Sequence, residues 1–255
     1  MTYRERMPRD TLTKEQILRT AVELLDDEGL DGLNMRSLGK RLGTVATAVY
    51  WHVKNKDDLI LLVGDRLWDE VELPDLDTVG WRAAATAMAT SLHAMFSRHP
   101  WLVQAFGSHL FYGPGKARHD DHNLAVYERA GFVGTQADRA AATVFTFVLG
   151  NVLGVSATAS LTRRLSRDGA DAEALFQDTM AKASEVAMRF PRLRARLGTP
   201  AAAAYATAPD QTFEFGLQAL LDGLEDQITG PRAPAGPDPR QRPVTTPGGS
   251  GDPSS

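Results

Sequence analysis

Residues 34–56 combine cationic and hydrogen-bonding side chains and contain no acid. Five lysines and arginines lie in this segment, whereas residues 57–229 have 15 basic and 22 acidic side chains. Lysine and arginine pair with phosphate oxygens, and hydroxyl and imidazole groups hydrogen-bond to them. A basic segment ahead of an acidic body therefore predicts a polyanion-binding surface and a separate second function. The basic residues are Arg36, Lys40, Arg41, Lys54 and Lys56.

Three short helices are predicted around this segment, because apolar residues recur at three-four spacing and polar caps mark the starts. Thr13 and Gln16 form a capping box for the first helix. A second helix, capped by Asn34, is separated by a turn at Gly43 from a third helix over residues 45–52. Two short helices joined by a glycine-containing turn and packed on a third make a helix-turn-helix. The second helix of this motif enters the major groove of DNA.

The predicted recognition helix is suited to close approach. Val49 and Val53 fall where they can face the core, and the other positions of 44–52 are mostly small or hydrogen-bonding. Small residues at the start of the helix allow it to lie against base edges. Asn55 caps a fourth helix, which carries acids in its first turn, where the helix dipole favours anions.

Residues 13–63 resemble the TetR family of repressors. The most specific part is the segment 50–59, which reads YWHVKNKDDL and is similar to the end of that family's recognition helix and the start of its next helix. Over the rest of the chain the resemblance is architectural. It implies a homodimer whose recognition helices occupy successive major grooves of a near-palindromic operator in double-stranded DNA. It also implies release of the DNA when a small-molecule effector enters the body.

The resemblance implies DNA contacts by Arg36, Thr47, Ala48, Tyr50, Trp51, His52 and Lys56. Tyr50, His52 and Lys56 match phosphate contacts, while Arg36 and Thr47 are better candidates for base edges. Residues 45–47 depart from the tetracycline repressor type, because they lack long side chains that read a purine through two hydrogen bonds. The operator sequence therefore cannot be transferred. Tyr50 and Trp51 have an alternative interpretation as half-buried core aromatics.

The pattern as a whole predicts an all-α protein with two domains. We expect a helix-turn-helix DNA-binding domain at 13–60 and a larger helical ligand-binding and dimerisation domain at 61–229. Residues 1–12 are expected to be loose, and residues 230–255 to be disordered, since they hold seven of the fourteen prolines. Helices of the larger domain are predicted at 81–99, 101–112, 116–130, 136–163, 171–190 and 210–228.

Residues 140–161 contain no charge over 22 positions, which is long enough to cross a bilayer. Threonine, serine, asparagine and alanine make up much of this run, and such weakly apolar composition inserts poorly. A helix sandwiched between its own core and a partner has the same appearance. We therefore expect no membrane span, but a homodimer in which helices 136–163 and 210–228 of both subunits form a four-helix bundle.

An effector pocket is predicted between the 81–112 helices and the 136–163 helix, for a mostly apolar or aromatic small molecule. Each apolar residue there has an alternative interpretation as core, which is the commoner role. Polar groups that can orient a ligand are scarce, as is usual in binding pockets. The predicted lining residues are Met88, Leu92, Trp101, Gln104, Phe106, His109, Phe145, Leu149 and Asn151.

Other chemistry has weaker support. His119 and His122 flank two aspartates and are suitable types for zinc or nickel, but they lie in a charged stretch that we expect to be solvated. No phosphate loop, dinucleotide fingerprint or nucleophile elbow is present, so no cofactor is expected. A helical binding module without DNA binding and an α-helical enzyme remain as alternatives. The chain has no cysteine and no secretory signal at its start, which favours the cytoplasm.

Overall fold

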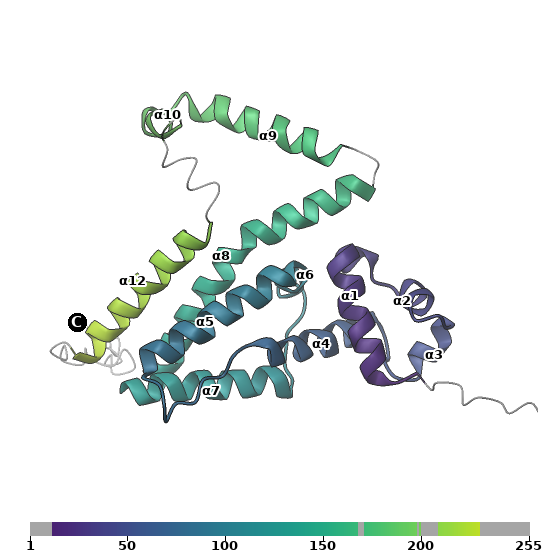
Figure 1. Cartoon of the computed structure of the whole chain (residues 1–255), viewed down its shortest axis with the longest axis horizontal. Helices are drawn as coiled ribbons and strands as arrows, with labels where there is room; N and C mark the ends of the chain where they lie inside the picture. The colour runs from purple at the N-terminus through teal and green to yellow at the C-terminus, as the bar shows by residue number, and fades with distance from the viewer. Residues whose placement is uncertain (1–11, 168–170, 198, 200–208, 230–255) are drawn as a thin grey trace, which may run out of the picture.

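The structure is a computed structural model that describes residues 12–167, 171–197, 199 and 209–229. Across these residues the chain is helical and has no strand, so the predicted all-α fold is confirmed. The N-terminal unit packs α1 against α2 and α4, and α2 against α3 (Figure 1). Its elements are α1 (Lys14–Gly32), α2 (Met35–Arg41), α3 (Ala46–Tyr50), α4 (Lys56–Leu67) and the 3-10 turn η1 (Trp68–Glu70).

The larger unit is built around α8, a long helix against which α5, α6, α7 and α12 pack (Figure 1). The helix α9 follows α8 in the chain and diverges from it (Figure 1), and its described residues from 173 to 186 are all exposed. The helices of this unit are α5 (Trp81–Arg98), α6 (Pro100–Ala105), α7 (Pro114–Ala130), α8 (Thr135–Arg167), α9 (Ala172–Ala187), α10 (Pro191–Arg196) and α12 (Pro209–Thr229).

The predicted helix starts follow from local capping. The Thr13 hydroxyl accepts the backbone N–H of Gln16 at 3.2 Å, and the Gln16 side chain accepts the backbone N–H of Thr13 at 2.8 Å. Asn34 likewise accepts the backbone N–H of Ser37 at 2.8 Å. At the predicted end of the first helix, Gly29 has φ 69°, a left-handed conformation that breaks α1 before its last turn.

The helix predicted at 101–112 was too long, because α6 ends at Ala105. Beyond it, the chain leaves the helix near Gly107 and folds back, so that Phe111 packs on the backbone of Gly64 in α4. A Cβ atom on Gly64 would lie only 2.2 Å from the Phe111 ring. This close approach couples the α6–α7 connection to α4, the helix that leaves the N-terminal unit.

Few of the predicted domain boundaries fall where the structure can be compared with them. The boundary after residue 60 falls inside α4, which is continuous from Lys56 to Leu67. The expected loose start at 1–12 lies outside the described residues except for Leu12, and the expected disordered tail at 230–255 lies wholly outside them. These end segments remain predictions.

Candidate nucleic-acid interface and effector site

The turn between α2 and α3 depends on two glycines. Gly43 has φ 66°, which residues with a side chain rarely adopt. Gly39 lies in α2 directly against the start of α3, where a Cβ atom would be 3.0 Å from the carbonyl oxygen of Thr44. The backbone N–H of Thr44 donates to the carbonyl of Gly39 at 2.9 Å. The two helices of the motif are thus held at close range by backbone contact.

Replacing Gly39 by alanine is expected to push α3 away from α2. Because the neighbouring atoms belong to the backbone, we expect this overpacking to lower the free energy of unfolding by about 1–3 kcal/mol. Urea denaturation measures the change. Lys40→Ala is the matched control, since Lys40 is exposed one residue later in the same helix and should leave stability almost unchanged. Equal stability of Gly39→Ala and the parent would contradict the close packing.

The helix α3 is anchored by valines and exposes its polar and aromatic residues. Val49 and Val53 are buried, whereas Tyr50 and Trp51 are 53% and 86% exposed. The alternative interpretation of these two aromatics as core residues is therefore wrong. Thr47 and His52 are also exposed, and Ala48 is half-buried. Five of the seven residues implied by the resemblance thus lie on or directly after α3.

The other two residues differ in their surroundings. Arg36 is exposed in the first turn of α2. Lys56 is half-buried, and its Nζ donates to the carbonyl oxygen of Leu30 at 2.6 Å. The Lys56 ammonium therefore ties the start of α4 to the end of α1, a structural role that the sequence did not predict.

An aromatic cluster occupies the centre of the larger unit. Phe145 of α8 lies within 6.5 Å, ring centroid to centroid, of Trp68, Phe96 and Phe106, and Phe106 contacts Phe111 at 4.8 Å. These five rings come from four different parts of the chain, so the cluster joins η1, α5, α8 and the α6–α7 connection. Two of them, Phe106 and Phe145, belong to the predicted effector lining.

Polar groups of α7 lie against this cluster. The Nζ of Lys116 lies 5.1 Å from the Trp68 ring centroid and 5.6 Å from that of Phe145, and it pairs with Asp120 at 2.5 Å. The buried indole N–H of Trp68 has no hydrogen-bond partner among the described residues. A buried donor without a partner is unusual and needs an explanation, such as a bound ligand or water.

A cavity of about 240 Å³ opens between α7 and α8 beside Lys116. Burial acts to raise the pKa of Asp120, but hydrogen bonds from His119 and Lys116 outweigh it and lower the pKa, so this carboxylate is charged. The cavity is lined by Lys116, Asp120, Asn123, Leu124, Asp138, Ala141, Ala142 and Phe145.

The remaining predicted lining residues lie outside this cavity. Met88 and Leu92 are buried core residues of α5, and Leu149 is half-buried in α8. The Asn151 amide donates within its own helix to the carbonyl of Phe147. Trp101 and Gln104 contact α1 and α8, respectively, through Asp26 and Ser156, and His109 lies 3.3 Å from Asp57 of α4.

The start of α7 is held by α4. One carboxylate oxygen of Asp65 accepts the backbone N–H of Lys116 at 2.9 Å, and the other accepts that of Gly115 at 3.1 Å. Asp65 thus caps a helix that follows it by fifty residues. Asp65 therefore links the backbone at Gly115 and Lys116 to α4.

His119 and His122, the residue types suited to a metal, have a different environment from the one expected. His119 is buried and its ring lies 4.8 Å from that of Trp68, so the expectation that this stretch is solvated was wrong for His119. Within the described part of the chain, no group of three or more metal-ligating side chains is gathered here or elsewhere.

Comparison with known families adds to this geometry. A model described as bacterial regulatory proteins, tetR family, matches residues 17–63, and one described as tetracyclin repressor-like, C-terminal domain, matches residues 73–228. The second match alone covers more than half of the chain. The chain belongs to the TetR family. It is a ligand-responsive, DNA-binding transcriptional repressor, and the helix-turn-helix and helical body are the two domains of that family.

Relatives of this TetR-family protein are themselves regulators. The HTH-type transcriptional repressor DrrR1 of Streptomyces coeruleorubidus is 32% identical over 91% of this chain and 84% of its own length. The class C tetracycline repressor protein of Escherichia coli is 30% identical over 84% of this chain and 91% of its own. The crystal structure of ActR of Streptomyces coelicolor with actinorhodin has a TM-score of 0.67 and 29% identity, covering 87% of this chain and 99% of that one.

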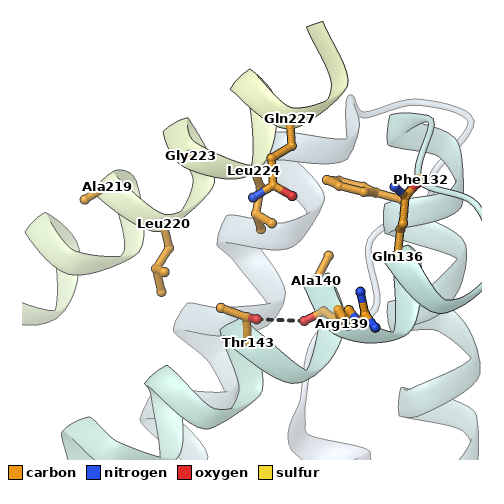
Figure 2. A pocket seen from close by; sticks show the side chains of 10 residues that line it. All are labelled: Phe132, Gln136, Arg139, Ala140, Thr143, Ala219, Leu220, Gly223, Leu224 and Gln227. Atoms are coloured by element: carbon orange, nitrogen blue, oxygen red, sulfur yellow. Dashed lines mark hydrogen bonds between the residues drawn. The ribbon is translucent and has the colours of Figure 1, made fainter. Parts of the chain in front are cut away.

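A groove on this TetR-family protein lies between the first turns of α8 and the last turns of α12 (Figure 2). Thr143 and Arg139 of α8 face Leu220 and Gly223 of α12 across it, and its volume is about 390 Å³. The groove lies on the two helices predicted to form the dimer bundle. It is open in a single chain.

Proposed function

We propose that the protein is a homodimeric repressor that reads a near-palindromic operator with α3 and leaves it when an aromatic effector binds beside α7. The exposed recognition surface carries this proposal. Thr47, Tyr50 and Trp51 are exposed on or directly after α3, which Val49 and the following Val53 hold in the core. We propose base contacts for Arg36 and Thr47 and phosphate contacts for Tyr50 and His52, with Ala48 and Trp51 lying against the groove.

Selection of bound fragments from genomic DNA tests operator binding. The recovered sequences should share two half-sites, and their affinity should fall steeply as salt rises, because phosphate contacts release counterions. A helical binding module without DNA binding predicts no enrichment. The relatives are transcriptional regulators, so we propose that the protein acts by binding DNA and not by catalysis.

Two observations support a homodimer. The first is a face of small and apolar residues shared by α8 and α12. We call it the dimer face; its members Thr143, Gly150, Leu153 and Ala157 on α8 and Ala219 and Gly223 on α12 are all exposed. The second is α9, which leaves Leu175, Phe176 and Met180 about 40–50% exposed. Helices that are this apolar and lie this far from their own core need a partner to cover them.

The dimer also accounts for the apolar character of α8. This helix is long and apolar enough over Thr135–Leu165 to span a membrane, and one third of its most apolar window is buried within the single chain. We propose that the second subunit, and not lipid, covers the remainder. A cytoplasmic protein without a membrane span follows from this proposal.

The effector site that we propose lies between the aromatic cluster and α7. Phe145 and Lys116 line the cavity and offer a ring face and a cation. Trp68 does not line it, but its ring lies 5.1 Å from the Nζ of Lys116, and its indole N–H has no hydrogen-bond partner among the described residues. An aromatic ligand with a hydrogen-bond acceptor fits this set. The cavity of about 240 Å³ is smaller than most pockets for drug-sized molecules, so binding must enlarge it by moving α7.

Movement of α7 provides the switch. Asp65 caps the start of α7, and Phe111 packs on Gly64, so both connections end on α4. Because α4 continues into the DNA-binding unit, its displacement changes the spacing of the two recognition helices from the value of about 34 Å that successive grooves require. Release follows only if the effector binds the displaced conformation more tightly.

Lys116→Met is expected to weaken effector binding about tenfold or more while leaving operator affinity unchanged, since a charge-assisted contact is lost. Compounds that raise the melting temperature of the parent protein supply the ligands, and each is then titrated into the variant by calorimetry. Lys182→Met is the matched control, because Lys182 forms a similar i,i+4 pair on exposed α9. If Lys116→Met bound every hit as the parent does, the site would be misplaced.

A further inference from the structure

The DNA-binding unit is fastened to the body at Asp26 of α1. Its Oδ1 accepts the indole N–H of Trp101 at 2.8 Å and lies 2.8 Å from Nδ1 of His99. Its backbone carbonyl accepts from Arg163 of α8 at 2.9 Å. Trp101 is fully buried and His99 is 7% exposed. One residue of the DNA-binding unit is thereby bonded to three residues of the body, just before the break in α1 at Gly29.

The same histidine reaches a second carboxylate. Nε2 of His99 lies 3.2 Å from Oε1 of Glu70, which belongs to η1 at the end of α4. Glu70 also pairs with Arg98 of α5 at 2.6 Å. His99, in the turn between α5 and α6, therefore bridges α1 and η1. This one ring therefore contacts the DNA-binding unit at two elements, in addition to the contacts that Asp65 and Gly64 of α4 make with α7 and Phe111.

The protonation state of His99 decides whether the bridge is complete. A neutral imidazole has one N–H, so one ring nitrogen would turn a lone pair toward a carboxylate, whereas the imidazolium donates to both. The charged groups that face the ring are Asp26 from α1, Glu70 from η1, Arg98 from α5 and Arg163 from α8. The carboxylates are in direct contact, while both arginines are engaged with other oxygens of these residues.

Burial alone would lower the pKa of His99 and is the strongest single influence. The hydrogen bonds and negative charges of Asp26 and Glu70 together outweigh it, so the pKa is raised above its ordinary value of 6.5. Because the pKa is raised, the protonated ring contributes its full stability to the bridge below pH 6.5. This contribution is lost as the pH rises through the higher pKa of the folded state.

We propose that Asp26, His99 and Glu70 form a joint that positions the DNA-binding unit, so that operator affinity falls when His99 loses its proton. The inference rests on the proposed operator binding. A dimer needs both recognition helices in place together, and a loosened joint lets each unit sample orientations that fit only one half-site. His99 is thus a positioning residue, since it touches no DNA.

The experiment measures operator affinity from about pH 6 to 8.5, around the ordinary titration range of histidine, for the parent and four variants. The operator affinity of the parent should fall about tenfold over this pH range, which is a common size for coupling between sites. His99→Gln, which retains a donor of similar size, should bind at the weaker level and lose most of the pH dependence. Glu70→Gln should shift the midpoint to lower pH, because it removes one carboxylate. Arg98→Gln also breaks the ion pair between Glu70 and Arg98, but it removes the cation and keeps the carboxylate. The midpoint should therefore stay unchanged or move to higher pH.

His52 on the recognition surface is also an imidazole, so His52→Gln controls for its contribution and should retain most of the pH dependence. NMR titration of the imidazole gives the pKa of His99 without DNA. A parental pH profile in His99→Gln, or a pKa of His99 at or below 6.5, would overturn the joint. Absence of operator binding at every pH would instead overturn the proposed function, while the NMR result would still report on the bridge.

Discussion

A chain with arginine in place of Gly150 should sediment as a monomer and should lose operator binding by at least about a hundredfold, since bivalent attachment contributes factors of this order. In the single chain, a Cβ atom at Gly150 would meet nothing within 4 Å, so the subunit fold has room for the new side chain. In the proposed bundle, the same side chain enters the dimer face and keeps the α8 helices apart.

Helix propensity adds an expected change in stability to this prediction. Glycine in a helix is less favourable than arginine by up to about 1 kcal/mol, so an isolated subunit should be slightly stabilised by Gly150→Arg. Gly223→Arg on α12 should behave in the same way, because its Cβ position is also open. Ala83→Arg, on an exposed position of α5, is the control that should remain dimeric. Dimers of both glycine variants in analytical ultracentrifugation would rule out the proposed dimer face.

Alanine at Arg36 or Thr47 is expected to weaken operator binding and to relax the base preference at one position of each half-site. Each good base contact contributes about 1–3 kcal/mol of discrimination, and a symmetric dimer loses two contacts at once. Tyr50→Ala should weaken binding to all sequences alike, because a phosphate contact fixes position without reading a base. Sequence selection from a randomised half-site library distinguishes the two outcomes.

The control for these variants is Arg192→Ala, which removes an exposed cation on α10, far along the chain from the recognition surface. Effector binding should be unchanged in all four proteins. If Arg36→Ala and Thr47→Ala kept the parental base preference, the specificity would have to come from the shape of the DNA or from other residues.

The DNA-binding unit was largely predictable because its signals are local. Capping by Thr13 and Asn34, the turn at Gly43 and the inward valines of α3 all involve neighbours within a few residues, and the structure confirms each of them. The role of Lys56 was missed because its partner, the carbonyl of Leu30, is 26 residues away. Apolar periodicity indicates which side of a helix is buried, but it does not identify the residues that this side contacts.

The proposed effector site was harder to predict for the same reason. Phe106 and Phe145 were found as apolar residues on the expected helices, whereas Trp68 and Lys116 come from outside the segments considered. One signal was available: Lys116, His119 and Asn123 recur at helical spacing on one side of α7, which is unusual for a side facing a core. The junction role of Trp101 depends on Asp26, 75 residues earlier, and no local pattern indicates that pairing.

Footprinting of selected operator DNA, with and without a stabilising compound, tests the central claim most directly. The account predicts two protected half-sites with centres one helical turn apart, about 34 Å along the axis. Protection should disappear when the compound saturates the protein, and it should be absent with Gly150→Arg. Protection of a single unsymmetrical site, or protection that persists with every compound that stabilises the parent protein, would contradict a dimeric repressor released by its ligand.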